Sequence, residues 1–338
     1  MKRGTAVDKK VVLGLSGGVD SAVAARLLQQ QGFEVFGLFL DIGNEGARED
    51  AHKVADELGL PLKIADISIE LEKNVCRPFI EAYLRGQTPN PCILCNPKVK
   101  FRTLLEYADS ICAEYVSTGH YARVSEGKLF KGRPENDQSY MLSGLTKAQV
   151  ARLILPLGDF NKTEVRAMAE SMGLPVAQKP ASMEICFIPD KNYSAYIEKR
   201  GIVPPEGNFV DADGNVLGRH RGIYHYTIGQ RRGLNIAAGK RIFVSEIRPD
   251  TNEVVLSEGE ELLADKISVS DVNWLVPQAE EFKADVRVRH SRTSTKASVM
   301  PDGANAEVCF EVPVRAPTKG QTAAFYIGDE VIGGGRIV

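Results

Sequence analysis

Residues 11–21 decide the fold, and they read Val11-Val12-Leu13-Gly14-Leu15-Ser16-Gly17-Gly18-Val19-Asp20-Ser21. An apolar, β-branched run opens this stretch, and two glycines follow it after Ser16. A helical pattern then covers residues 22–31 and ends at Gly32, and a second β-branched run covers residues 35–40. This order predicts a strand, a helix and a second strand, which is the βαβ opening of an α/β fold.

The same alternation continues through the first half of the chain. Helical patterns are predicted at residues 48–58, 70–84, 99–108, 147–154 and 162–172, and strands at 62–67 and 115–118. Asn161 is the expected N-cap of the last helix because Glu164 stands three residues later. Repeated strand and helix alternation predicts a doubly wound parallel sheet with helices on both faces.

After about residue 205 the pattern becomes β-rich. Turn signals such as Asp213-Gly214 separate short alternating runs. The predicted strands cover residues 241–247, 253–256, 284–289, 297–300, 307–314 and 323–327, and the chain ends in a Gly333-Gly334-Gly335 segment. We therefore predict three domains: an α/β domain at 1–200, a small central β-rich domain at 201–264 and a C-terminal β-barrel at 265–338.

Composition restricts the class of protein. The 338 residues are 43% hydrophobic, 25% charged and 7% aromatic, which is typical of a globular protein of two or three domains. Lys and Arg (42) nearly balance Asp and Glu (44), so any nucleic-acid surface must be a local basic patch. No signal peptide or membrane-spanning run is recognisable, which predicts a cytoplasmic protein whose six cysteines are reduced thiols.

The glycine pair places backbone N–H groups at the start of a helix, an arrangement that binds phosphate. A P-loop would carry Lys after its last glycine, and none is present, which disfavours kinase or GTPase chemistry. The alternative is a plain turn without a ligand. The position at the first strand-to-helix junction favours a nucleotide, because open α/β sheets bind ligands there.

Residues 86–101 form a proline-rich segment that holds Cys92 and Cys95 before a predicted helix. A helix start would lower the pKa of a thiol. The spacing by itself fits a redox pair, half of a zinc site or two ligands of an iron-sulfur cluster. A four-cysteine zinc site is disfavoured because no second such pair exists. Cys186 lies far away in Ser182-Met183-Glu184-Ile185-Cys186-Phe187-Ile188-Pro189.

Several segments taken together resemble the bacterial tRNA-specific 2-thiouridylase (MnmA) family of ATP pyrophosphatases (PP-loop enzymes). They are the Ser16–Ser21 loop, Thr88-Pro89-Asn90-Pro91 with Cys95-Asn96, Lys98-x-Lys100-Phe101, Thr118-Gly119-His120-Tyr121, Asp137-Gln138-Ser139-Tyr140, Glu184-Ile185-Cys186-Phe187, and Tyr226-Thr227-Ile228-Gly229-Gln230-Arg231-x-Gly233-Leu234. The segments occur in this order over nearly the whole chain.

The resemblance implies a tRNA sulfurtransferase. ATP adenylates the C2 oxygen of a wobble uridine (position 34), and sulfur then replaces that oxygen, giving 2-thiouridine, AMP and pyrophosphate. Residues 1–200 would be the catalytic domain, and Asp20 would help to hold Mg²⁺. The implied ATP contacts are Gly14, Leu15, Ser16, Gly17, Gly18, Val19, Asp20, Ser21, Leu40 and Gly119.

The resemblance also implies a role for two cysteines. Cys186 would receive sulfur as a persulfide from a sulfur-relay protein or cysteine desulfurase. Cys95 would be the nucleophile that attacks this persulfide, releasing sulfide or closing a Cys95–Cys186 disulfide. Asn90, Pro91 and Cys92 would border the target base.

The tRNA surface is expected on several segments. By resemblance, His120, Asn136, Asp137, Gln138, Arg287, Val288 and Gln321 would contact tRNA, with the central domain 201–264 adding contacts. Strand alternation predicts that Arg287 and Arg289 share one face, with His290, Arg292 and Lys296 nearby, which would suit phosphate contacts. The alternative for Arg287 and Arg289 is a solvated strand face that binds no RNA. The alternative for His120 is a hydrogen-bonded histidine of the protein core.

One departure from the family concerns position 92, where many members carry Asp. Either catalysis proceeds without that carboxylate, or Cys92, Cys95 and Cys186 hold an iron-sulfur cluster; we favour the persulfide route. Cys76, Cys112 and Cys309 are predicted to be small buried hydrophobes.

Two other functions of the chain remain possible from the sequence. One is a PP-loop ligase that acts on a small molecule, which leaves Cys95 and Cys186 unexplained. The other is a non-catalytic tRNA-binding or iron-sulfur sensor protein.

Overall fold

The computed structural model describes residues 9–180, 185–237, 239–291 and 293–338. The chain divides into two compact units. The first contains the described residues of Met1–Asn74, Ile93–Met183 and Asp329–Val331, and the second those of Val75–Cys92, Glu184–Gly328 and Ile332–Val338. The domain boundaries expected near residues 200 and 264 stay a prediction.

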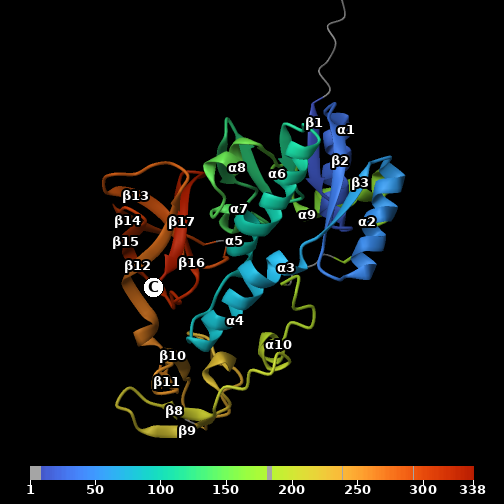
Figure 1. Ribbon diagram of the computed structural model, residues 1–338. Helices are drawn as coiled ribbons and strands as arrows, with labels where there is room; N and C mark the ends of the chain where they lie inside the picture. Colours follow the sequence, from blue (N-terminus) through green and yellow to red (C-terminus); the bar gives the residue numbers. More distant parts are fainter. Residues whose placement is uncertain (1–8, 181–184, 238, 292) are drawn as a thin grey trace, which may run out of the picture. The chain divides into compact units, whose positions relative to one another are not determined.

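A five-stranded parallel sheet is the centre of the first unit, as predicted (Figure 1). Its order is β3-β2-β1-β4-β7, and its strands are β1 (Lys10–Gly14), β2 (Glu34–Asp41), β3 (Leu62–Asp66), β4 (Tyr115–Ser117) and β7 (Leu153–Ile154). β1 pairs with β2 on one side and β4 on the other. Val11, Val12 and Leu13 are fully buried, which explains why the three central positions of β1 are apolar.

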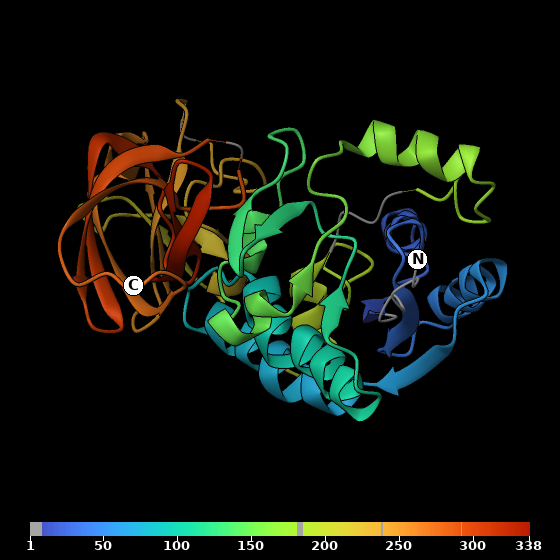
Figure 2. The same ribbon diagram turned by 90° about the horizontal axis from the view of Figure 1, so that it is seen from above.

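Helices cover both faces of this sheet. α1 (Val19–Gln30), α2 (Glu45–Leu58) and α9 (Lys162–Ser171) share one apolar cluster with Val11 and Leu13. α6 (Phe101–Ser110) packs on β1 and β4 and lies on the opposite face (Figure 2). Val12 alternates to that face. The predicted doubly wound arrangement is therefore confirmed.

Two predicted helices differ from the structure. The stretch at 70–84 divides into α3 (Ser68–Leu71), a π-turn (Glu72–Cys76) and α4 (Arg77–Leu84), because Pro78 has no N–H to continue the hydrogen-bond ladder. The stretch at 147–154 ends early: α8 (Lys147–Ala151) stops, and the next residues form β7 beside β4.

The remaining elements of the first unit are short. The hairpin β5 (Ala122–Ser125) and β6 (Lys128–Lys131) precedes α7 (Ser139–Leu142). Asn161 is the N-cap of α9: its side chain accepts from Glu164 N at 2.9 Å, and the Glu164 carboxylate accepts from Asn161 N at 2.8 Å. This is the capping box that the sequence predicted.

The second unit contains a four-stranded sheet of order β10-β11-β8-β9. Its strands are β8 (Gly207–Val210), β9 (Val216–His220), β10 (Phe243–Arg248) and β11 (Glu253–Ser257), next to a 3-10 turn at Ile223–His225. Phe209, Val244 and Leu256 belong to its buried core. α10 (Tyr193–Glu198) lies in the same unit.

A closed six-stranded barrel completes the chain, as predicted. It consists of β12 (Leu263–Trp274), β13 (Phe282–Arg287), β14 (Thr295–Asp302), β15 (Asn305–Arg315), β16 (Thr322–Ile327) and β17 (Glu330–Ile337), entered through a 3-10 turn at Glu260–Leu262. Pairing of β12 with β17 closes it. A Cβ at Gly333 would lie 2.5 Å from the Asn273 carbonyl oxygen, so this closure requires glycine there.

Within the described ranges, none of the helices combines the length and apolar character needed to cross a membrane.

Candidate functional site

The glycine loop lies at the position in the parallel sheet where the order of successive strands changes from one side of β1 to the other. β1 is followed by strands to one side, β2 and β3, and then by β4 on the other side. The loop that leaves β1 therefore faces the Thr118-Gly119-His120 segment that leaves β4. Such a switch point is where open α/β sheets bind ligands. Of the predicted ATP contacts, Gly14 to Ser21 and Gly119 meet here, and Leu40 lies half-buried on the neighbouring β2.

Two glycines in this region have no room for a side chain. Gly17 has φ +70°, and a Cβ there would lie 2.5 Å from the Ala47 carbonyl oxygen of α2. A Cβ on Gly119 would lie 2.8 Å from the Asp20 carbonyl carbon. The loop is thus fixed between α2 and the segment after β4, and both positions require glycine.

Hydrogen bonds hold the loop closed on α1. Ser21 Oγ donates to the Gly18 carbonyl oxygen at 3.0 Å and accepts from Ser16 N at 3.2 Å. Gly18 is the N-cap of α1, and no side chain caps this helix. The positive end of a 12-residue helix therefore faces the loop, which is the arrangement that stabilises a bound anion.

Asp20 stands in the first turn of α1 and is held by a buried tyrosine. Tyr121 is fully buried, and its hydroxyl donates to Asp20 Oδ1 at 2.6 Å. Burial raises the pKa of Tyr121, and the hydrogen bond to Asp20 raises it further, so the phenol remains a donor. Gln138 supports the same residue: its side chain accepts from Tyr121 N at 3.0 Å.

A lysine that the sequence analysis missed also reaches the loop. Lys179 Nζ donates to the Gly17 carbonyl oxygen at 3.1 Å and to Asp50 Oδ2 at 2.6 Å. The bond with Lys179 lowers the pKa of Asp50. Lys179 is 162 positions from Gly17, and no local motif marks it, so only the folded structure shows that a cation lies against this glycine loop.

His120 is held as a neutral imidazole. Its Nδ1 lies 2.6 Å from Thr118 Oγ1. Burial lowers the pKa of His120 well below its usual value, and the nearby Lys100 adds to the effect. A neutral ring can exchange hydrogen bonds with RNA but supplies no charge for a phosphate contact.

The lowered pKa makes a prediction about acid stability. Below the unfolded-state pKa of about 6.5, His120 binds a proton in the unfolded chain but not in the folded protein. The contribution of the neutral ring to the free energy of unfolding is therefore fully present above that pH and decreases as the pH falls below it. We expect the melting temperature to drop less between pH 7.5 and 5.5 in His120→Gln than in the unsubstituted protein. Equal drops in thermal unfolding scans would contradict a lowered pKa of His120 in the folded protein.

The two neighbouring cysteines lie within a helical run and not before one, which corrects the sequence analysis. α5 (Pro91–Cys95) continues through a π-turn (Asn96–Lys100) into α6. The run begins earlier than predicted because Asn90 Oδ1 accepts from Cys92 N at 3.2 Å and Pro91 fits the first helical position. Cys92 and Cys95 are both half-buried and three positions apart, which places them on one helix face.

Cys186 is an exposed residue. It lies in a turn closed by the bond from Ile188 N to the Ile185 carbonyl oxygen at 2.9 Å. The neighbouring Phe187 packs against Phe79, with ring centroids 5.6 Å apart. The apolar residues Phe187 and Ile188 of this turn are thus packed, while Cys186 itself is an exposed residue.

The predicted tRNA contacts at 136–138 also have bonds within the chain. Asp137 is buried, and Oδ1 accepts from Gly132 N at 2.8 Å while Oδ2 accepts from Ser139 Oγ at 2.9 Å. Asn136 Nδ2 donates to the Phe160 carbonyl oxygen at 3.4 Å. These bonds order the segment that supports Tyr121.

Arg287 lies in the barrel wall and not on an exposed face. It is the last residue of β13, only 6% exposed, with its guanidinium 4.8 Å from the Tyr326 ring centroid. Val288 packs against the barrel core. Arg289 lies beyond the strand and donates to the Ala316 carbonyl oxygen at 3.2 Å. The predicted common face of Arg287 and Arg289 is wrong because the strand ends between them; Arg292 lies outside the described residues.

Gln321 connects the barrel to the predicted base-contacting segment. Its Nε2 donates to the Thr88 carbonyl oxygen at 2.8 Å, and Thr88 N donates to the Lys319 carbonyl oxygen at 2.9 Å. Gly320 permits this approach, since a Cβ there would lie 3.1 Å from Thr88 N. Gln321 therefore positions the segment that leads to Asn90 and Pro91.

The other cysteines differ from one another. Cys76 is buried, as predicted, and Cys309 is half-buried. Cys112 is exposed, which corrects its assignment as a buried hydrophobe; it follows α6 in a left-handed turn with φ +55°. In the described part of the chain, no three His, Cys, Asp or Glu side chains are grouped to hold a metal ion.

Three family descriptions match consecutive parts of the chain. The "tRNA methyl transferase HUP domain" matches residues 9–190, the "tRNA methyl transferase PRC-barrel domain" residues 194–258, and the "Aminomethyltransferase beta-barrel domain" residues 264–337. The first of these covers more than half of the chain.

Curated relatives match over the full length. A tRNA-specific 2-thiouridylase MnmA of Lachnoclostridium phytofermentans is 42% identical over 359 residues, covering 98% of this chain and 99% of that protein. The MnmA of Carboxydothermus hydrogenoformans is 44% identical, covering 97% of each chain. That of Clostridium acetobutylicum is 41% identical, covering 98% of this chain and all of that protein. Identity of this extent, together with the glycine loop and the cysteines at 95 and 186, shows that the chain belongs to the family of tRNA-specific 2-thiouridylases.

Proposed function

We propose that this enzyme replaces the C2 oxygen of a tRNA uridine with sulfur at the expense of ATP. The observation that carries the proposal is the glycine loop at the sheet switch point, in a chain that also has the half-buried Cys95 and the exposed Cys186 in segments far apart in sequence. A nucleotide loop without a P-loop lysine suits attack at the α-phosphate, and the thiols suit sulfur transfer.

Adenylation is the first step. The uracil C2 oxygen attacks the α-phosphate of ATP, and pyrophosphate leaves. The N-terminus of α1 and the backbone of Gly17 and Gly18 would hold the departing pyrophosphate. The Asp20 carboxylate, fixed by Tyr121, is a hard oxygen ligand of the kind that Mg²⁺ accepts alongside phosphate oxygens.

Lys179 would assist the same step. Its ammonium lies against the Gly17 carbonyl oxygen and is oriented by Asp50, so it can contact a phosphate oxygen at the loop. Positive charge there stabilises the negative charge that gathers on the leaving pyrophosphate.

We expect Lys179→Met to lower kcat of ATP-dependent thiolation by about tenfold, because the ammonium is one of several donors and remains partly solvated. Lys179→Arg should retain more activity. The matched control is Lys53→Met, since Lys53 also pairs with Asp50 but makes no bond to the loop. Pyrophosphate release by single-turnover assay measures the effect. Equal losses in Lys179→Met and Lys53→Met would exclude this role.

Sulfur transfer follows. The proposal assigns to Cys186 a persulfide, received from a sulfur-relay or cysteine desulfurase protein, and its solvent exposure supports such delivery. The terminal sulfur attacks C2, and AMP leaves with the former C2 oxygen. Cys95 then attacks Cys186 Sγ, the persulfide bond breaks with its electron pair passing to the transferred sulfur, and a Cys95–Cys186 disulfide remains for reduction by an external thiol.

Cys92, Asn90 and Pro91 would border the target base. Many members of the family carry Asp at position 92, so this chain has a thiol where a carboxylate is common. The persulfide route needs no metal at these cysteines. Anaerobic purification should therefore give protein without iron or acid-labile sulfide above background. Stoichiometric iron bound through Cys92, Cys95 and Cys186 would replace this route with a cluster mechanism.

The test of function uses mass spectrometry of tRNA nucleosides, because the family descriptions speak of methyl transfer and the curated relatives of thiolation. The protein is incubated with unmodified tRNA and Mg²⁺, adding either ATP with a persulfide donor or S-adenosylmethionine. We expect 2-thiouridine in the first mixture and no methylated nucleoside in the second. Methylation without thiolation would overturn the proposal.

A further inference from the structure

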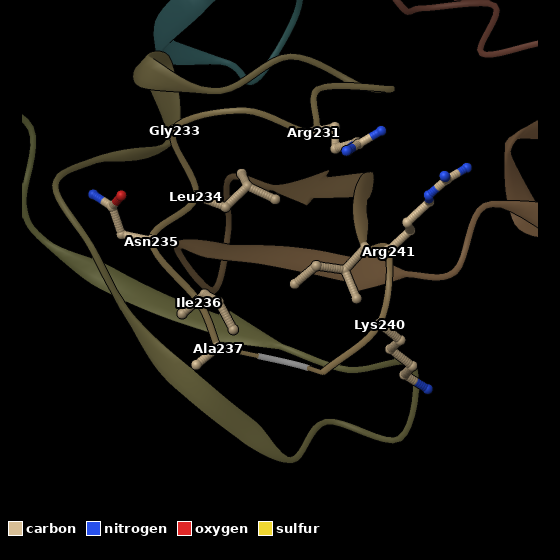
Figure 3. A pocket seen from close by; sticks show the side chains of 9 residues that line it. Arg231, Gly233, Leu234, Asn235, Ile236, Ala237, Lys240 and Arg241 are labelled. Atoms are coloured by element: carbon tan, nitrogen blue, oxygen red, sulfur yellow. The ribbon is translucent and has the colours of Figure 1, made fainter.

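A pocket of about 460 Å³ lies in the second unit and is lined by nine described residues between Arg231 and Ile242 (Figure 3). None of the residues assigned above to ATP, sulfur or the target base lines it. Three of its lining residues are cationic and three are branched apolar ones, namely Arg231, Lys240, Arg241, Leu234, Ile236 and Ile242.

The family segment Tyr226–Leu234, to which no role was assigned, supplies three residues that line this pocket, namely Arg231, Gly233 and Leu234. Gly229 N donates to the Val244 carbonyl oxygen at 2.8 Å, and Val244 N donates to the Gln230 carbonyl oxygen at 2.9 Å. The Gln230 side chain accepts from Thr227 N and donates to the Arg232 carbonyl oxygen, both at 3.0 Å. These bonds tie the segment to β10 and fix where Arg231 leaves the backbone.

The floor is apolar and anchored to the sheet. Leu234 is 5% exposed and belongs to the buried core with Phe209 and Val244. Ile236 and Ile242 pack against the same core. A Cβ on Gly218 of β9 would lie 2.5 Å from Ile236 Cδ1, so glycine there allows Ile236 to lie against the strand.

The cations lie along one side of the pocket (Figure 3). Lys240 pairs with Glu258. Arg231 and Arg241 are exposed and make no hydrogen bond or ion pair to any residue in the part of the chain that the structure describes. No acidic residue lines the pocket among those described. Because the chain as a whole carries a net charge of −2, this is a local concentration of positive charge.

We propose that this pocket binds one nucleotide of the tRNA substrate, outside the uridine that is thiolated; the inference rests on the proposed function. The guanidinium groups of Arg231 and Arg241 hold a phosphate, for which their planar donor geometry is suited. The apolar floor covers the attached ribose or an unstacked base. A concave site of this volume fits one small planar group, such as a base or a ribose. An acidic protein partner would need only the exposed cations at the edge of the pocket and would leave its apolar floor unused.

The experiment measures the dissociation constant of the full-length protein for unmodified tRNA by fluorescence anisotropy at several salt concentrations. For Arg231→Gln/Arg241→Gln we expect affinity to fall by about tenfold or more at 0.15 M salt. The slope of log K against log salt should fall in magnitude by about 1, because the two guanidinium groups hold one phosphate. Arg232→Gln is the matched control, because Arg232 is an exposed neighbour that does not line the pocket, and its affinity should change by less than about twofold.

A second pair of variants tests the interior without removing a cation. Ala237 is exposed and lines the pocket. Ala237→Glu adds a negative charge to the lining of the pocket and should weaken tRNA binding, while Ala237→Gln, which adds a side chain of the same shape without the charge, should not. The rate of ATP-dependent thiolation at saturating tRNA should remain near that of the unsubstituted protein. The weaker binding should therefore appear as a higher KM for tRNA.

The outcomes separate the two proposals. Unchanged tRNA affinity in the double variant and in Ala237→Glu, with thiolation by the unsubstituted protein, overturns the pocket proposal alone. Loss of delivery by a sulfur-donor protein at unchanged tRNA affinity also overturns it and assigns the pocket to a protein partner. Failure of the unsubstituted protein to form 2-thiouridine overturns the proposed function.

Discussion

Replacement of Cys186 by serine is expected to abolish 2-thiouridine formation while ATP and tRNA binding persist. A serine oxygen cannot carry sulfane sulfur, and the exposed turn at 185–188 offers no other thiol. We expect the rate to fall by at least about a thousandfold, as for other covalent nucleophiles. Mass spectrometry of nucleosides after incubation with ATP, Mg²⁺ and a persulfide donor measures it.

Cys112→Ser is the matched control for this variant. Cys112 is also exposed and free of any disulfide, but it follows α6 in a turn to which no chemistry is assigned. Its replacement should leave the rate within about twofold, the range of a neutral surface change. Thiolation that survives in Cys186→Ser, or that is lost equally in both variants, would contradict the persulfide assignment.

Gly17→Ala is expected to remove ATP-dependent activity almost completely. The new methyl group would lie 2.5 Å from the Ala47 carbonyl oxygen and 2.9 Å from Ala51 N, so either the loop or α2 must move. Displacing a phosphate-holding loop by about 1 Å costs about a hundredfold in rate. Single-turnover pyrophosphate release with saturating tRNA measures this loss.

Gly43→Ala separates the effect of contact from that of backbone strain. Gly43 also has a positive φ, +87°, but a Cβ there meets nothing within 4 Å. The change should cost only about 1–2 kcal/mol of stability, for a non-glycine residue in the left-handed region, and leave kcat unchanged. If Gly43→Ala loses activity as Gly17→Ala does, the close packing of the loop against α2 is not what the reaction needs.

The sequence predicted the parallel sheet and its glycine loop because both depend on local patterns. The centre of β1 is buried on both faces, so Val11, Val12 and Leu13 are all apolar, and the loop follows this strand directly. The capping box at Asn161 and Glu164 is equally local. Such features are readable because each is complete within a few residues.

Lys179 could not be predicted because its partners are distant in sequence. Gly17 lies 162 positions away and Asp50 lies 129 positions away, and neither pairing leaves a spacing pattern. The start of α5 was missed for a different reason. Three prolines suggested a loop, but Pro91 occupies the first helical position, where the absent N–H costs nothing, so the helix begins before the cysteines.

The burial of Arg287 shows where strand alternation fails. Alternation assumes that a strand continues, but β13 ends at Arg287, and both Val286 and Arg287 are buried. The aromatic ring of Tyr326 on β16 accepts the guanidinium inside the barrel wall. β12 was also missed, since its polar residues conceal a 12-residue strand that closes the barrel.

The measurement that tests the central claim most directly follows the displaced oxygen. The tRNA carries uridine labelled with ¹⁸O at C2, and the products with ATP and a persulfide donor are analysed by mass spectrometry. Adenylation of the base predicts one ¹⁸O atom in the phosphate of AMP for each 2-thiouridine formed. Label recovered in water or pyrophosphate, with AMP unlabelled, would contradict activation of the C2 oxygen by ATP.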